Sequence, residues 1–279
     1  MRHTSLPATL TPPRSPRQES AVLSTISLSP EERTSLASRL YAASCSGDLT
    51  QISLLLSLGA SLNTATKVNG LYEAFKPAKH GHLSPLAGAA TYGQIEAVKL
   101  LISSGADINP HVNHSSSSPL HQACRSNDTE MVRLLLSADA QVNVQNCYKT
   151  TPLMYAVKYG SPALLALVLS YYPRLEVPSF MEMTAAHWAV FNGRPEALVS
   201  LLRAGANPDA LMADGSTPLH CAAMNGTDEM ANTLIAYGAD IKLRDGQDRT
   251  VMEVALNNKR DGVVAILRAA EAQTLGRKR

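Results

Sequence analysis

Histidines and cysteines are the residues of this chain that could hold a metal ion or act as nucleophiles, and it has eight and four of them. His80 and His82 lie close together, as do His111 and His114, but a pair supplies only half of the roughly four ligands that zinc takes. The cysteines stand far apart with no CxxC pair, which suits neither a zinc ribbon nor a disulfide-stapled secreted domain. We therefore expect no metal site and a reduced, intracellular compartment: the cytoplasm, with the nucleus left open.

Known catalytic signatures do not occur either. The chain contains no GxSxG elbow, P-loop, HExxH or protein-kinase signature, and no cysteine stands with a histidine and an orienting partner at a known spacing. Cys124 occupies a position where we expect a small buried residue, so a packed thiol is the simplest interpretation. The sequence predicts a protein that is not an enzyme and takes no cofactor.

Charge and hydropathy exclude two further classes of partner. Lys and Arg total 25 and Asp and Glu total 23, so the net charge is only +2, too small for a protein that binds DNA by neutralising phosphates. No stretch approaches the roughly 18 consecutive apolar residues of a membrane helix. We expect no nucleic acid, no membrane insertion, and a monomer when the chain is by itself.

A motif of Ser or Thr, Pro and Leu recurs along the chain, and its spacing decides the architecture. With the proline position as the anchor, copies stand at residues 85, 119, 152, 185 and 218, position 251 continues the series, and the period is 34 once and 33 thereafter. Gly or Asn follows 8 residues after each of the first five anchors, and a Gly-Ala pair follows 20 residues after three of them. The same spacing run backwards places an anchor at residue 39, which makes seven repeats.

Each recurring residue has a physical reason. Ser or Thr before Pro is an N-cap followed by a proline in the first helical turn, where its missing N–H costs nothing. Gly or Asn can take the left-handed conformation that ends a short helix, and the apolar residues that follow predict a second helix with one apolar face. The second Gly ends that helix and leads into an extended loop. Each repeat is therefore predicted to be a helix-turn-helix unit.

With motifs such as Thr217-Pro218-Leu219-His220 and Gly-Ala pairs in register, the chain resembles the ankyrin repeat family over roughly residues 39–270. The resemblance implies an all-α fold, an ankyrin-repeat solenoid of about seven helix-turn-helix repeats with hairpin loops, in which each unit buries its apolar face against its neighbours. It also implies a structural role for His121, His187 and His220, which stand two residues after their anchors and would tie neighbouring loops together.

Composition divides the chain into three parts. We expect residues 1–28, rich in Ser, Thr, Pro and Arg, to be a disordered tail, residues 29–270 an ankyrin repeat domain, and residues 271–279 a basic C-terminal tail. The first tail offers Thr11-Pro12 and Ser15-Pro16 for phosphorylation. Its arginines also leave a targeting signal open, although its prolines would break the helix that such a signal needs. An insertion of 13 residues lies within residues 64–83, and we assign it no role.

The residues that ankyrin stacks do not need for packing project from hairpin loops and inner helices onto one concave surface. At these positions, repeats four to six collect aromatic and methionine side chains, which a solvated face would not do. The predicted partner-binding residues are Tyr148, Tyr155, Tyr159, Phe180, Met181, Met183, Trp188, Phe191 and Met224. The alternative is that some of them fill gaps at the junction of repeats four and five, where Ala185-Ala186 replaces Pro-Leu and Tyr172-Pro173 replaces Gly-Ala.

The predicted function is that of a protein–protein interaction module or adaptor, which binds another protein or a peptide through the concave face of repeats four to six. The alternative is a regulatory inhibitor that masks a surface of its partner, with the N-terminal tail as a phosphorylation switch. Ankyrin adaptors of ubiquitin ligases usually carry an additional C-terminal recruiting box, and residues 269–279 are too few to form one. We therefore disfavour that subtype.

Overall fold

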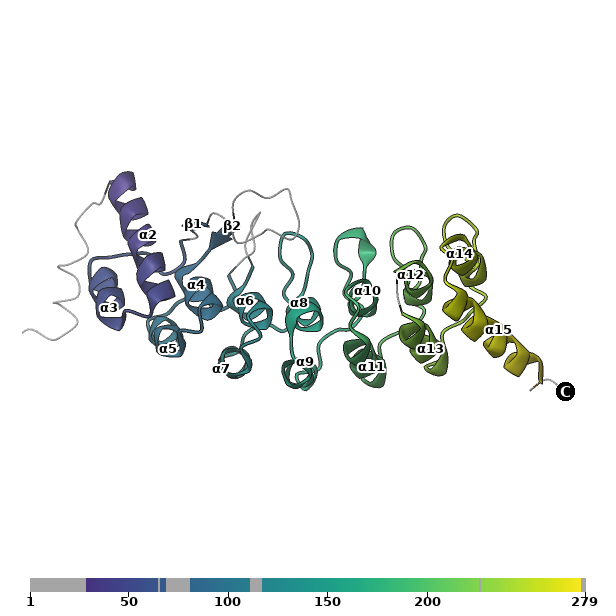
Figure 1. Ribbon diagram of the computed structural model, residues 1–279. Helices are drawn as coiled ribbons and strands as arrows, with labels where there is room; N and C mark the ends of the chain where they lie inside the picture. The colour runs from purple at the N-terminus through teal and green to yellow at the C-terminus, as the bar shows by residue number, and fades with distance from the viewer. Residues whose placement is uncertain (1–28, 65, 69–80, 111–116, 226, 277–279) are drawn as a thin grey trace, which may run out of the picture.

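The computed structural model describes residues 29–64, 66–68, 81–110, 117–225 and 227–276. Within them, seven helix pairs follow one another in chain order as a single row (Figure 1). The pairs, from repeat one to repeat seven, are α2 (Pro30–Ser46) with α3 (Leu49–Ser57), α4 (Pro85–Thr91) with α5 (Ile95–Ser103), α6 (Pro119–Arg125) with α7 (Thr129–Ser137), α8 (Pro152–Tyr159) with α9 (Pro162–Leu169), α10 (Ala185–Phe191) with α11 (Pro195–Arg203), α12 (Pro218–Asn225) with α13 (Asp228–Ala236), and α14 (Val251–Asn257) with α15 (Asp261–Gly276). The predicted all-α solenoid is confirmed.

The recurring motif begins the first helix of a repeat as the sequence predicts. The side chains of Ser84, Ser118 and Thr151 each accept a hydrogen bond from the backbone N–H three residues on, and proline occupies the first turn of all three helices. At the other end of the helix, Gly93 and Asn127 take the left-handed conformation. Gly160 does not: it is extended, with φ −73° and ψ 153°, so the predicted left-handed end of α8 is wrong.

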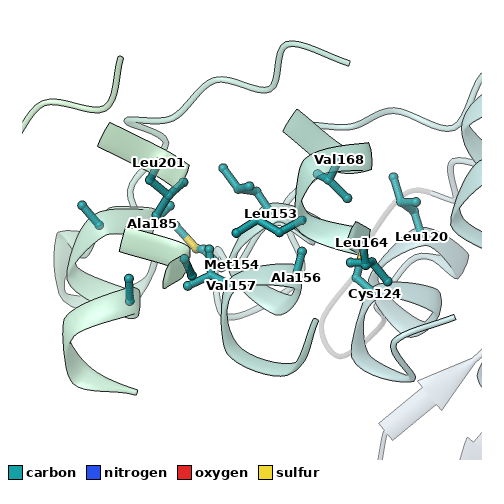
Figure 2. Packing of buried hydrophobic residues seen from close by; sticks show 14 of the residues in the cluster. Leu120, Cys124, Leu153, Met154, Ala156, Val157, Leu164, Val168, Ala185 and Leu201 are labelled. Carbon is teal, nitrogen blue, oxygen red and sulfur yellow. The ribbon is translucent and has the colours of Figure 1, made fainter. Parts of the chain in front are cut away.

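The apolar core runs without a break along the row, between the two helices of each repeat and from one repeat to the next. Figure 2 shows its middle part, where Cys124 of α6, Met154 and Val157 of α8, and Ala185 of α10 all point into the layer between the helices. These four side chains are at most 1% exposed. Since every repeat contributes to one shared core, no repeat is stable by itself in this arrangement.

A hairpin loop precedes each first helix of repeats four to seven and rises above it in Figure 1. We call the loops and the first helices the inner face, and α3, α5, α7, α9, α11, α13 and α15 the outer helices. Adjacent loops are joined through their backbones, because the N–H groups of Phe180, Ala213 and Gly246 donate to Tyr148, Met181 and Asp214 at 3.0, 2.9 and 2.8 Å. The loops of repeats four to seven therefore form a continuous edge.

Two short antiparallel strands, β1 (Thr66–Val68) and β2 (Gly81–Leu83), flank the insertion and pair Thr66 with Leu83. Most of the insertion lies outside the described residues, as do residues 1–28 with their two Ser/Thr-Pro sites and residues 277–279 of the basic tail. Helix α2 begins at Pro30, after a capping box in which Ser29 and Glu32 satisfy each other's backbone N–H groups.

Buried histidines link three of the junctions between repeats. His121 Nδ1 accepts a hydrogen bond from the N–H of Ser118, and its Nε2 lies 2.8 Å from the carbonyl oxygen of Thr150 in the next repeat. His187 and His220 make the equivalent contacts to Ser216 and Arg249, each at 3.2 Å. The neutral ring therefore serves as acceptor on one side and donor on the other, which agrees with the structural role that the resemblance implies.

The junction of repeats four and five lacks this link. Met154 occupies the histidine position, and the carbonyl of Met183, which a histidine would meet, accepts a hydrogen bond from Ser179 Oγ instead. It also accepts from the N–H of Ser179, as the equivalent carbonyls do in the loops of repeats four, six and seven. A different contact joins these two repeats. The guanidinium of Arg194, at the start of α11, donates to the carbonyl oxygens of Lys158 and Gly160 at the end of α8. Arg194 thus supplies a donor to two carbonyls at the end of α8.

We predict that Arg194→Ala destabilises this junction. The variant leaves two helix-end carbonyls without a charged donor, a loss of about 1.5–3 kcal/mol by the usual strength of such hydrogen bonds. A urea titration followed by circular dichroism measures it, with Arg133→Ala, an exposed arginine of α7, as the matched control. Equal midpoints for both variants would show that Arg194 does not stabilise the junction.

We also predict that mild acid destabilises the fold through the buried histidines. Burial lowers the pKa of His121 and of His187 from the ordinary 6.5 to about 4. Between these two pH values the unfolded chain binds protons that the folded chain does not, so the stability present above pH 6.5 is lost as the pH falls toward 4. The loss is at most about 1.4 kcal/mol per pH unit for each histidine.

Urea midpoints measured at pH 7.5, 6.0 and 5.0 test this dependence. The double variant His121→Gln, His187→Gln, compared by slope rather than by absolute stability, should show a flatter decline than the unmodified chain. Parallel declines would assign the acid sensitivity to other groups.

Candidate functional site

The hairpin loop of repeat five has the most unusual backbone of the predicted binding surface. Ser179 and Met183 close it through a hydrogen bond of 2.9 Å from the N–H of Ser179, and η2 (Phe180–Glu182) forms its tip. Met181 and Glu182 both lie in the left-handed region, with φ of 64° and 59°. Each non-glycine residue held there costs on the order of 1–3 kcal/mol, and such strain persists only where surrounding contacts enforce it.

Two apolar side chains stand in solvent at the tip of this loop. Phe180 is 72% exposed and Met181 is 52% exposed. The backbone beside them is occupied, because Phe180 donates to the loop of repeat four and Met181 accepts from the loop of repeat six. The loop is thus anchored on both sides by its backbone while its apolar side chains remain available for contact.

Trp188 of α10 is hydrogen-bonded to the same loop. Its Nε1 donates to Ser179 Oγ at 3.0 Å, and its ring packs against the core while staying partly exposed. One repeat earlier, Tyr155 of α8 makes the corresponding contact, with its hydroxyl accepting from Asn146 Nδ2 at 3.3 Å. In both repeats, the side chain three residues after the anchor position is thus hydrogen-bonded to the side chain six residues before that position.

A lysine lies among aromatic rings at the end of α8. The Nζ atom of Lys158 is 5.0 Å from the centre of the Tyr159 ring and 5.9 Å from the centre of the Trp188 ring. The Tyr155 and Tyr159 rings are 5.9 Å apart, centre to centre. These contacts connect the inner helices of repeats four and five and place a positive charge between aromatic walls.

None of the nine predicted partner-binding residues is fully buried. Phe180, Met181 and Phe191 are exposed, and the others are half-buried: Tyr148, Tyr155, Tyr159, Met183, Trp188 and Met224. Of the half-buried ones, Tyr155, Met183, Trp188 and Met224 also pack against the core, as the gap-filling alternative requires. The geometry brings residues of repeats four and five together. That these residues bind a partner stays a prediction.

Two residues of this region are absent from the predicted partner-binding set. Ser179 holds both the indole of Trp188 and the carbonyl of Met183, and Lys158 brings the only charge into the aromatic group of Tyr155, Tyr159 and Trp188 among the described contacts. The signal that could have found Ser179 is its place six residues before the anchor, which Asn146 shares in the preceding repeat.

Potential nucleophiles and metal ligands do not gather in the described part of the chain. Burial raises the pKa of the Cys124 thiol, and burial with the nearby Asp214 charge raises that of Cys221 to about 12, so both thiols stay protonated near neutral pH. Over the residues whose structure is described, no three His, Cys, Asp or Glu side chains are placed to share a metal ion. Over the same residues, no helix combines the length and apolarity that crossing a membrane requires.

We predict a measurable coupling between Trp188 and Ser179. In a double-mutant cycle of Trp188→Phe and Ser179→Ala, the coupling energy should be about 0.5–1.5 kcal/mol, since one neutral hydrogen bond is lost. Urea midpoints of the two single variants and the double variant give this energy. A coupling near zero would mean that the indole does not hold the loop.

Comparison with known proteins gives matches to a family model and to solved structures. The family model described as ankyrin repeats (3 copies) matches residues 86–179 and again residues 182–275. Among solved structures, the human ASB11 ankyrin repeat domain is similar, with a TM-score of 0.62 and 26% sequence identity over 83% of this chain and 96% of that one. No curated protein sequence gives a significant match.

Proposed function

Because this chain belongs to the ankyrin repeat family, whose repeats form protein–protein interaction modules, we propose that it is an adaptor that binds a partner through the inner face of repeats four to six. The observation that carries this proposal is the loop of repeat five, which presents Phe180 and Met181 to solvent on a strained backbone. The ankyrin fold is typically a non-enzymatic scaffold, so the proposal concerns recognition rather than catalysis.

Energetics favour a binding role for this loop over a purely structural one. A side chain buried on folding contributes roughly 1.5–3 kcal/mol, but Phe180 gains little of this in the isolated chain because most of its surface stays in water. The left-handed residues beside it add a cost that the isolated chain does not recover through apolar burial. Covering the exposed rings with a partner would recover that free energy, and interface hot spots favour large apolar side chains within an ordered surround.

The half-buried aromatics fit the surrounding surface. Tyr155, Tyr159 and Trp188 present parts of their rings between the loop and the ends of the inner helices. Since their other parts pack against neighbours, little rotamer entropy remains to be lost on binding. The four free cysteines agree with the intracellular location expected from the sequence.

We predict that Phe180→Gln and Met181→Gln weaken partner binding without weakening the fold. A partner recovered by affinity capture with the unmodified chain, and identified by mass spectrometry, should then be purified and titrated against each variant. Loss of a hot spot costs about 2 kcal/mol or more, roughly thirtyfold in affinity, for at least one of the two.

The matched control is Leu54→Gln, which changes an apolar side chain that is 50% exposed on the outer helix of repeat one. It should bind normally, and all three variants should keep the urea midpoint of the unmodified chain. Unchanged affinity in both loop variants would remove the loop of repeat five from the binding site.

A further inference from the structure

We propose, on the basis of the function proposed above, that the partner supplies an extended segment with an acidic residue at Lys158 and an apolar residue at Phe180 and Met181. The segment would lie along the junction of repeats four and five, from the end of α8 up to the loop of repeat five. Three features of this surface carry the inference: its charge, its aromatic walls and its continuity.

The last turns of the inner helices carry positive charge here and no negative charge, whereas the exposed carboxylate of Glu182 lies in the loop of repeat five. Arg125 and Lys158 occupy the same position, six residues after the anchor, in the last turns of α6 and α8. At the positions three, six and seven residues after the anchor, none of the seven repeats has an Asp or Glu. The guanidinium of Arg194 adds a third cation at the end of α8. A partner of acidic chemistry is therefore complementary to this part of the inner face.

The helix dipole alone does not account for the arrangement. A cation in the last turn of a helix is favourable anywhere in a stack. Lys158 differs in lying over two aromatic rings from two repeats, those of Tyr159 and Trp188. Aromatic ring faces attract the ammonium group electrostatically and so favour its position at this junction.

A chain of contacts leads without interruption from the charge of Lys158 to the apolar tip of the loop. Lys158 lies over the Trp188 ring, the Trp188 indole donates to Ser179, and Ser179 precedes Phe180 in the loop. Phe180 in turn donates to Tyr148, at the level of the loop of repeat four. From about 1.5 Å per helical residue and about 3.3 Å per extended residue, the path is at most roughly 20 Å long. An extended segment covers it with about six residues.

The test uses 12-residue peptides selected by phage display on the full chain, then synthesised with a fluorophore and titrated by anisotropy. We expect selected peptides to carry an acidic residue and an apolar residue no more than about six positions apart. Exchange of the acid for its amide should weaken binding about tenfold, and Lys158→Gln should do the same. The two changes together should cost little more than either alone, and raised salt should weaken binding only where both charges are present.

Lys242→Gln, an exposed lysine of the loop between repeats six and seven, is the matched control and should bind as the unmodified chain does. If Phe180→Gln weakens the peptides but neither the amide exchange nor Lys158→Gln does, the acidic partner is wrong while the proposed function stands. If none of the three changes weakens either the peptides or a captured partner protein, both fail. If no selected peptide depends on this junction although a captured partner protein does, the occupant is a folded surface and the extended segment is wrong.

Discussion

The inability of any repeat to bury its own apolar face is the constraint on which this structure depends. Its helices are mostly 7–9 residues long, too short to persist alone in water, and the core that they share passes from one repeat to the next. Stability therefore lies in junctions as much as in repeats. Hydrogen bonds also join neighbouring repeats. They run from buried histidines to loop carbonyls and from one loop to the next.

The junction of repeats four and five shows what changes when one of these links is given up. Met154 cannot donate to the carbonyl of Met183, and Ser179 Oγ donates to that carbonyl instead. The same loop presents two apolar side chains to water, and its Met181 is left-handed where the equivalent residues of the neighbouring loops are not. Glu182 shares its left-handed conformation with Lys149, Gly215 and Asp248 of those loops. The guanidinium of Arg194 joins the two repeats by donating to carbonyls at the end of α8. The missing histidine contact and the candidate recognition loop thus occur at the same junction.

Most of the fold can be predicted from the periodicity of the sequence, because caps, helix ends and apolar faces each require particular residue types at fixed spacing. Seven pairs and the proline-led starts of α4, α6 and α8 follow from it directly. The loop of repeat five does not follow, since no glycine marks Met181 or Glu182 as left-handed. Gly160 fails in the opposite sense: a glycine permits a left-handed end but does not enforce one, and here α8 continues into an extended residue. The exposure of Phe180 and the half-burial of Trp188 likewise depend on the path of the loop, which spacing alone does not specify.

Trp188 shows that one residue can fill a gap in the core and still present a surface to a partner. Its ring packs against the core, its indole holds the candidate loop, and its outer surface faces Lys158. A segment bound along this path would contact both repeats and add its binding free energy to their junction, as any ligand selective for the folded state does. Because stability in a solenoid is a sum of local terms, that gain would fall on the junction of repeats four and five rather than on the stack as a whole. Binding and local stability would then rise together, and the residue that fills the gap would be the one through which they are coupled.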